Sequence, residues 1–141
     1  LDRVHPASRT NPLVAKDHSD AYYSWTENPT GKVHTVARVR FNELPDGTSV
    51  TNDAVTRFSG VSNRVQPQGE RPVSWCREHG KGRVFYTSLG HREDLWSDDP
   101  AMKGRLNSVE MAKQYQKHIL GGIKWALGLE KGDATPNPEV K

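Results

Sequence analysis

Cysteine is almost absent from this chain, and the other features that it lacks narrow its class. Cys76 is the single cysteine among 141 residues, so no disulfide bond can form within the chain. No run of apolar residues approaches the roughly 18–20 that a membrane-spanning helix needs, and no signal peptide is visible. We therefore expect no membrane partner, and the one thiol leaves the compartment open.

The chain also lacks a concentration of charge of one sign. It carries 20 lysine and arginine residues against 17 aspartate and glutamate residues, a net charge of +3, and these charges are mixed along the sequence. A protein that binds nucleic acid normally shows a patch or stripe of basic residues. We therefore expect no nucleic-acid partner.

Hydrophobic residues are few, since they make up 33% of the chain and the mean hydropathy is −0.82. The length of 141 residues fits one domain, but this composition allows only a thin core. A thin core indicates either long surface loops or a piece of a larger structure.

Short strand patterns are present. Residues 32–41 alternate in apolar character with period two, which predicts a half-buried strand. Residues 72–76 and 83–89 are two further β-prone runs, and a glycine-containing turn at 78–82 joins them. This arrangement predicts a β-hairpin.

From Asn107 the apolar spacing changes to that of a helix, which we expect to end at Gly128. Asn107 is the predicted N-cap, with Glu110 three residues later. Gly121 and Gly122 lie inside this helix, where each costs about 1 kcal/mol relative to alanine, so we expect the helix to approach a sheet closely there. The expected buried face consists of Val109, Ala112, Gln116, Ile119, Leu120, Ile123, Ala126 and Leu127.

One candidate site follows the second strand of the hairpin, where Gly90 breaks the strand pattern. Directly after it come His91, Arg92, Glu93 and Asp94. A strand that ends at a glycine directs the next side chains out of the carboxyl edge of a sheet, where open α/β sheets bind ligands. An imidazole there is suited to proton transfer, and a carboxylate beside it orients the ring or competes for the proton. The alternative is that His91 caps the turn and the three charged residues are solvated.

A second candidate site combines histidine, carboxylates and aromatic rings near the amino terminus. It includes "HPAS" at residues 5–8 and "DHSDAYYSWTENP" at residues 17–29. An aromatic ring stacks on sugar C–H groups, while carboxylates and imidazoles hydrogen-bond to sugar hydroxyls. The composition is therefore typical of a carbohydrate site. The alternative is that Asp20 caps a turn and that a loop is covered by Tyr22, Tyr23 and Trp25.

A metal site is a weaker hypothesis for these positions. No close ligand spacing such as His-Glu-x-x-His occurs, and no glycine-rich phosphate loop is present, because the short "GKGR" joins two strands. We therefore expect no metal and no other cofactor. The residues that would have to converge on a metal are His5, Asp17, His18, Asp20 and His91.

Four stretches, in this order, carry a resemblance to a known family. They are "HPAS", "DAYYSWTENPTGKVHTVARV", "RPVSWCREHGKGRVFYTSLGHREDLW" and "HILGGIKWALG". Together they resemble the carboxyl-terminal part of the trehalose-utilisation (ThuA-like) family, with residues 80–91 as the most specific part. We accordingly expect part of a ThuA-like domain at residues 1–128 and a polar tail at 129–141 that frays.

The resemblance implies a fold. The family is similar to class I glutamine amidotransferases, whose fold is a flavodoxin-like parallel sheet flanked by helices. We therefore expect an α/β fold in which this sheet is incomplete, because the family's first βαβ half has no counterpart in the sequence. Either the chain is a fragment of a larger enzyme, or a second chain completes the sheet. Relatives of this type are often exported, which favours a periplasmic or secreted location.

The resemblance also implies residue roles. In the superfamily a strand ends in a histidine followed two residues later by a glutamate, which matches His91 as the catalytic acid/base and Glu93 as its orienting partner. The family pattern Asp-Glu-x-Tyr reads "DAYY" here, so Ala21 stands where relatives have an acidic residue. The implied substrate-binding residues are His5, Asp20, Tyr22, Tyr23 and Arg92.

Three functions are compatible with these observations. The first is a hydrolase or lyase that acts on a disaccharide or 3-keto sugar by acid/base-assisted elimination or hydrolysis. The second is a non-catalytic sugar-binding or assembly module, which the missing half and Ala21 favour. The third is a fragment of a larger enzyme. The first function requires that His91 share a cavity with the segment around Asp20.

Overall fold

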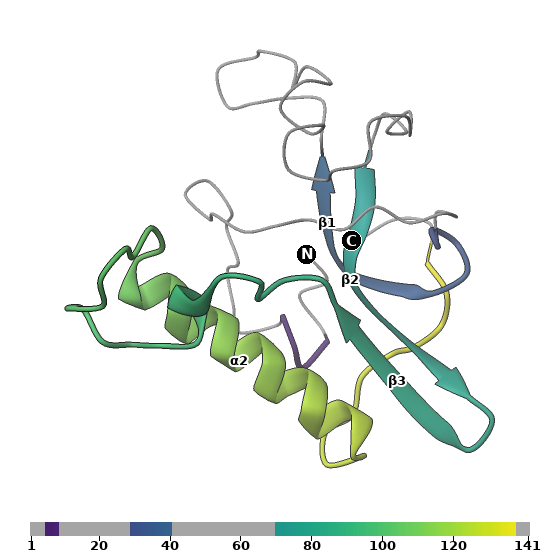
Figure 1. Ribbon diagram of the computed structural model, residues 1–141. Coiled ribbons are helices and arrows are strands. Elements are labelled where there is room, and N and C mark those ends of the chain that lie inside the picture. Colours follow the sequence, from purple (N-terminus) through teal and green to yellow (C-terminus); the bar gives the residue numbers. More distant parts are fainter. Residues whose placement is uncertain (1–4, 9–28, 41–69, 138–141) are drawn as a thin grey trace.

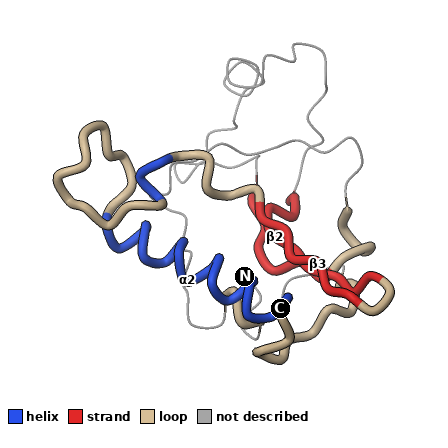
Figure 2. The backbone as a smooth tube through the Cα atoms, turned by 60° about the horizontal axis from the view of Figure 1, so that its bottom comes forward, coloured by secondary structure: helices blue, strands red, loops and turns tan. Residues whose placement is uncertain are grey.

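The computed structural model describes residues 5–8, 29–40 and 70–137, which form a small sheet beside one long helix (Figure 1). The helix runs along one side of the strands (Figure 2). No helix in this described part is long and apolar enough to cross a membrane. The elements in chain order are β1 (His34–Arg40), β2 (Glu70–His79), β3 (Gly82–Thr87), the 3₁₀ helix η1 (Glu93–Leu95) and α2 (Val109–Ala126).

The three strands form an antiparallel sheet in the order β1-β2-β3. His79 at the end of β2 pairs with Gly82 at the start of β3, so only Gly80 and Lys81 form the turn between them. Gly80 has a φ of 59°, which tight hairpin turns favour and which glycine adopts without strain. The predicted hairpin is confirmed, with a shorter turn than expected.

The fold is α/β in the broad sense that an α-helix packs on a β-sheet. A parallel, flavodoxin-like sheet is not seen among the described strands, because both of their pairings are antiparallel. β2 and β3 are antiparallel because only two residues join them. A two-residue turn can connect antiparallel strands, whereas parallel strands need a long crossover.

The first four residues of β1, 34–37, are buried on both faces, so the prediction of a half-buried strand is wrong for this part of it. Residues 33–37 are all buried, and the pairing of this segment with β2 is irregular. One face of β1 packs into the core, where Val36 belongs to the same cluster as Trp125. On this face the imidazole of His34 also donates a hydrogen bond to the Thr135 carbonyl at 2.8 Å.

α2 begins and ends at residues that satisfy its terminal backbone groups. The Ser108 hydroxyl accepts a hydrogen bond from the Met111 N–H at 3.0 Å, so Ser108 is the N-cap instead of the predicted Asn107. Asn107 does not cap because its backbone and side chain donate to Asp94. Gly128 follows the helix with a φ of 76°, as predicted for its end.

The buried face of α2 matches the predicted one only in part: Ala112 is buried, and Ile119 and Ala126 pack against the core. Leu120, Ile123 and Leu127, which we expected to be buried, are 51%, 49% and 69% exposed. The helix turns its glycines inward, and small residues allow a closer approach than leucine does. The buried residues are Met111, Ala112, Tyr115, His118, Gly121, Gly122 and Trp125.

The glycine pair in α2 confirms the predicted close approach to the sheet. A Cβ atom at Gly122 would overlap the ring of Phe85 on β3. A Cβ atom at Gly121 would overlap the backbone of Pro6 and Ala7. One glycine therefore allows contact with the sheet, and the other allows contact with the loop at residues 5–8.

Two clusters of buried side chains form the described core. The Trp125 cluster consists of Ala7, Val36, Cys76 and Trp125, with Phe85, Ala126 and Ala134 packed against it. The Tyr115 cluster consists of Leu95, Met111 and Tyr115, with Leu89 and Ile119 packed against it. The first joins the sheet to the carboxyl-terminal half of α2, and the second joins η1 to the amino-terminal half.

The polar tail after α2 packs against the sheet, so the prediction that it frays is wrong as far as Asn137. The Asn137 side-chain oxygen accepts a hydrogen bond from the Thr35 N–H at 2.7 Å, and the Asn137 N–H donates to the Val33 carbonyl at 3.2 Å. The Trp125 indole donates to the Gly132 carbonyl at 3.1 Å. The tail is ordered because it satisfies backbone groups on the outer edge of β1.

Candidate functional site

The chain turns sharply at Gly90, three residues after β3. Gly90 has a φ of 105°, and a side chain there would overlap the ring and hydroxyl of Tyr115. The Tyr115 hydroxyl donates a hydrogen bond to the Leu89 carbonyl at 3.3 Å, which fixes the loop on α2. Gly90 breaks the strand as predicted, and His91 follows it with an exposed side chain.

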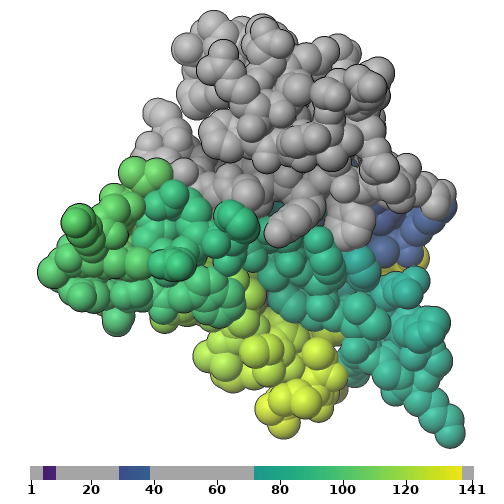
Figure 3. Space-filling model, in the orientation of Figure 1, coloured from purple at the N-terminus to yellow at the C-terminus, as the bar shows by residue number. Residues whose placement is uncertain are grey.

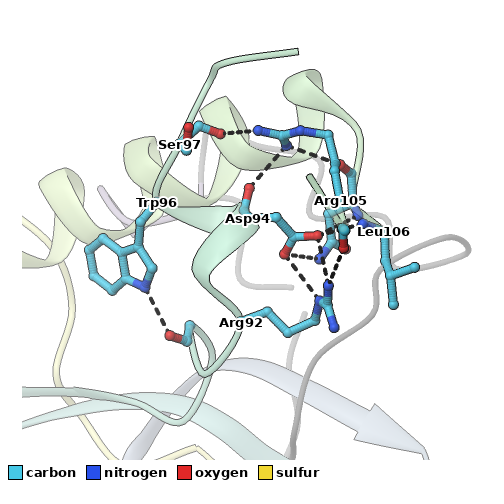
Figure 4. Close-up of polar contacts among 9 residues, drawn as sticks. Arg92, Asp94, Trp96, Ser97, Arg105 and Leu106 are labelled. Atoms are coloured by element: carbon cyan, nitrogen blue, oxygen red, sulfur yellow. Dashed lines mark hydrogen bonds and ion pairs between the residues drawn. The ribbon is translucent and has the colours of Figure 1, made fainter. Parts of the chain in front are cut away.

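η1 places Glu93 and Trp96 on the same side of one turn. The Trp96 N–H donates to the Glu93 carbonyl at 3.0 Å, and side chains three residues apart are eclipsed in 3₁₀ geometry. Both side chains are exposed, Trp96 to 55%. The Trp96 indole N–H donates to the Gly90 carbonyl at 2.9 Å (Figure 4), so the residue before His91 is tied to the same turn.

Asp94 points to the opposite side of the backbone from Trp96 (Figure 4). Its buried carboxylate accepts hydrogen bonds from Nε and Nη2 of Arg92, both at 3.1 Å. It also accepts from the backbone N–H groups of Leu106 at 2.7 Å and Asn107 at 2.9 Å. Burial alone would raise the pKa of Asp94, but the hydrogen bonds from Arg92, Asn107 and Leu106 together outweigh burial and hold this pKa well below its usual value. Asp94 is therefore a structural anion that fixes the loop.

The segment between η1 and α2 lies on the surface (Figure 3), and Arg105 holds its backbone together. Its guanidinium donates to the carbonyls of Ser97 at 2.6 Å, Asp99 at 2.9 Å and Asp94 at 3.1 Å. A buried carbonyl outside helices and sheets, such as that of Asp94, needs such a partner. The loop that carries His91 is thus held by two arginines and one carboxylate rather than by regular secondary structure.

The predicted site residues lie in different settings. His91 and Glu93 are exposed on the loop after β3. The Arg92 guanidinium, predicted to contact a sugar, binds the Asp94 carboxylate and donates to the Gly104 carbonyl at 3.2 Å. The cavity predicted between His91 and the segment around Asp20 is not tested by the described residues, so it stays a prediction. Three predicted sugar contacts lie outside the described residues: Asp20, Tyr22 and Tyr23.

His5, the remaining predicted sugar contact, lies in the core and is 0% exposed. The centroid of its ring lies 5.4 Å from that of Trp125, 6.1 Å from that of His34 and 6.3 Å from that of Phe85. Its Nδ1 accepts a hydrogen bond from the Ala7 N–H at 3.2 Å. This setting is that of a structural residue, and the predicted contact between His5 and a sugar gains no support from it.

His118 is also buried, on the inner face of α2. Its Nδ1–H donates to the Ala7 carbonyl at 2.9 Å, and its Nε2 accepts from the Thr87 hydroxyl at 3.2 Å. Burial lowers the pKa of His118 to about 4, partly opposed by the hydrogen bond to Ala7. No group of three or more His, Cys, Asp and Glu side chains is placed to bind a metal ion in the part of the chain that the structure describes.

Trp96 is the residue of this loop that the sequence analysis missed. It ends the run "GHREDLW", three residues after Glu93. In a 3₁₀ turn this spacing sets the two side chains on the same side, so the signal was the turn itself, which the sequence analysis did not expect. The same turn explains why Asp94 and Leu95, which lie between the exposed Glu93 and Trp96, are buried.

Comparison with known proteins gives the family. Neither the curated proteins nor the solved structures include a match to the chain. The family ThuA, described as trehalose utilisation, matches residues 1–126, which include the loop after β3 and the whole of α2. The chain therefore belongs to the ThuA family, which lies within the class I glutamine amidotransferase-like superfamily.

Proposed function

We propose that this protein processes a disaccharide or keto-sugar, with His91 as its general acid/base. The observation that carries the proposal is the family match over residues 1–126, because a trehalose-utilisation family indicates a carbohydrate-related role. The exposed loop after β3 supports it, since a group that exchanges protons with substrate must be accessible.

A 3-keto disaccharide suits this chemistry. The proton on the carbon beside the carbonyl is acidic, and the neutral imidazole of His91 removes it. The C–O bond on the next carbon then breaks, its electron pair leaves with the glycosidic oxygen, and the imidazolium returns a proton to that oxygen. Water adds to the new double bond to complete hydrolysis, or the unsaturated sugar is released as the product of elimination.

The other residues of the proposed site bind or orient. Glu93, which follows His91 by two residues, is proposed to orient the imidazole of His91. Arg92 is proposed to bind the sugar through its guanidinium. Asp94 fixes the position of this group, since Arg92 Nε lies 3.1 Å from the Asp94 carboxylate. The proposal keeps three further sugar contacts from the sequence: Asp20, Tyr22 and Tyr23.

The proposed site needs a more complete sheet than the described strands form. We propose that β1, β2 and β3 form the antiparallel part of a mixed sheet whose parallel, flavodoxin-like strands come from an amino-terminal half or from a second chain. Those strands cannot pair with β1 at Thr35 while the Asn137 side chain accepts from its N–H. They would join the sheet elsewhere.

The test is turnover of trehalose and of 3-ketotrehalose, followed by chromatography of the released monosaccharide. We expect His91→Ala to lower kcat/KM by about 100-fold or more, the size of a lost general acid/base. His79→Ala is the matched control, because His79 is also exposed but lies at the end of β2. Unchanged turnover by His91→Ala would remove this residue from the mechanism.

A second candidate function is a non-catalytic sugar-binding or assembly module. Ala21 favours it, because the Asp-Glu-x-Tyr pattern that the resemblance implies has an acidic residue at this position. Calorimetric binding of either disaccharide without any released product would support the module and reject the enzyme.

A further inference from the structure

We propose that Trp96 is the aromatic platform on which a sugar ring stacks beside His91. The inference rests on the proposed function and deepens it, because it names the residue that would recognise the apolar face of the sugar. Trp96 was not among the sugar contacts predicted from the sequence.

The exposure of Trp96 is the first observation. Trp125 is 1% exposed in the core, whereas 55% of Trp96 is exposed. Tryptophan is a large amphipathic side chain that is usually well buried, and it is enriched where proteins bind other molecules. Exposure of its rings therefore needs a reason.

The fixed orientation of Trp96 is the second observation. Its indole N–H donates to the Gly90 carbonyl at 2.9 Å. Its ring packs edge-on against Tyr115, with centroids 4.9 Å apart and planes at 85°. A ring held in this way loses little conformational entropy when a ligand binds, which favours affinity.

The neighbours of Trp96 are the third observation. The 3₁₀ turn sets Glu93 on the same side as Trp96, and the indole is bonded to the carbonyl directly before His91. An exposed indole thus shares one short loop with the exposed side chains of Glu93 and His91. A sugar ring matches this combination, since it offers C–H groups on one face and hydroxyls around its rim.

A purely structural role for Trp96 would depend on its N–H. Trp96→Phe separates the two roles, because it keeps an aromatic face and removes the hydrogen bond to Gly90. Trp96→Leu removes the aromatic face as well. Leu106→Ala is the matched control, because Leu106 is a 65% exposed apolar residue of the same surface segment.

The experiment is calorimetric titration of the full chain with trehalose and with 3-ketotrehalose. We expect Trp96→Leu to weaken binding by roughly tenfold, the effect of losing one aromatic contact. Trp96→Phe should stay within about threefold of the wild type, and Leu106→Ala should bind like the wild type. In the wild type, saturating sugar should also protect tryptophan fluorescence from iodide quenching, and Trp96→Phe should abolish that protection.

The outcomes separate this inference from the proposed function. Wild-type binding that persists unchanged in folded Trp96→Leu would overturn the platform and leave the proposed function standing. A wild type that binds neither disaccharide would overturn both. If Trp96→Leu does not fold, the iodide measurement on the wild type and Trp96→Phe decides the question alone, and absence of sugar protection would overturn the platform.

Discussion

His91 follows β3 on an exposed loop, whereas His118 lies on the buried face of α2 with both ring nitrogens hydrogen-bonded inside the protein. The buried imidazole is kept neutral, because burial lowers the pKa of His118 to about 4. It contributes to packing and cannot exchange protons with a ligand. Accessibility therefore separates the candidate catalytic histidine from the structural one, although the two side chains are chemically the same.

The two regions are also held by different forces. The buried region is built on the Trp125 cluster and is covered by the tail, so apolar packing and backbone hydrogen bonds dominate. The exposed loop rests on the Tyr115 cluster through Leu95, but its backbone is held by the Asp94 carboxylate, which accepts hydrogen bonds from Arg92 and Asn107. Changes that remove one force should leave the other region largely intact.

The largest expected effect comes from Asp94→Ala, which removes the anion of the exposed region. Arg92 loses its partner, and the N–H groups of Leu106 and Asn107 lose their acceptor. We expect the free energy of unfolding to fall by roughly 3 kcal/mol. Urea denaturation measures this, with Asp98→Ala as the control because Asp98 is exposed. A loss no larger than that of the control would mean that charge does not hold the loop.

The second-largest effect is expected from acid, which should destabilise the buried region through His118. Between pH 6.5 and about 4 the unfolded chain binds a proton at His118 that the native chain does not, so the free energy of unfolding falls as the pH falls. The loss should reach about 3 kcal/mol. Asp94 does not contribute in this window, because its lowered pKa costs stability only below its usual value of 3.8.

Urea denaturation at pH 7, 5.5 and 4.5 tests this expectation. His118→Gln removes the titrating group, so its stability should depend less on pH than that of the wild type. An equal slope in the two proteins would show that another group causes the acid sensitivity.

The smallest expected effect comes from Asn137→Ala, which loosens the cover of the buried region. The buried Thr35 N–H loses its acceptor at 2.7 Å, so we expect a loss of about 1 kcal/mol. The Cys76 thiol donates to the Asp133 carbonyl at 3.6 Å beneath this tail, so its reaction with a thiol reagent should become faster. Lys131→Ala, at an exposed position, is the control. Equal thiol rates in the two variants would show that Asn137 does not secure the tail.

Elements with a strong local signal were predictable from the sequence. The hairpin and the end of α2 at Gly128 depend on glycines at positive φ, and these positions were correct. The close approach at Gly121 and Gly122 was predictable for a similar reason, since a glycine pair inside a helix is unfavourable without a close neighbour.

Features that depend on distant contacts were not predictable. The inward face of α2 is set by Phe85 and the loop at residues 5–8, so counting apolar residues included leucine and isoleucine side chains that are exposed. The tail is ordered by the edge of β1, about 100 residues away in sequence, with which it shares no local pattern. In the site, Gly90 and the exposed His91 followed from the local pattern, whereas Trp96 depended on recognising a 3₁₀ turn.

The docked tail also has a practical consequence for the choice of expression boundaries. The family match stops at residue 126, but the indole of Trp125 and the edge of β1 are both covered by residues beyond it. A gene trimmed to the match would yield a protein with a bare strand edge and an uncovered tryptophan, a combination that promotes aggregation. Any truncation or carboxyl-terminal fusion should therefore begin only after Asn137.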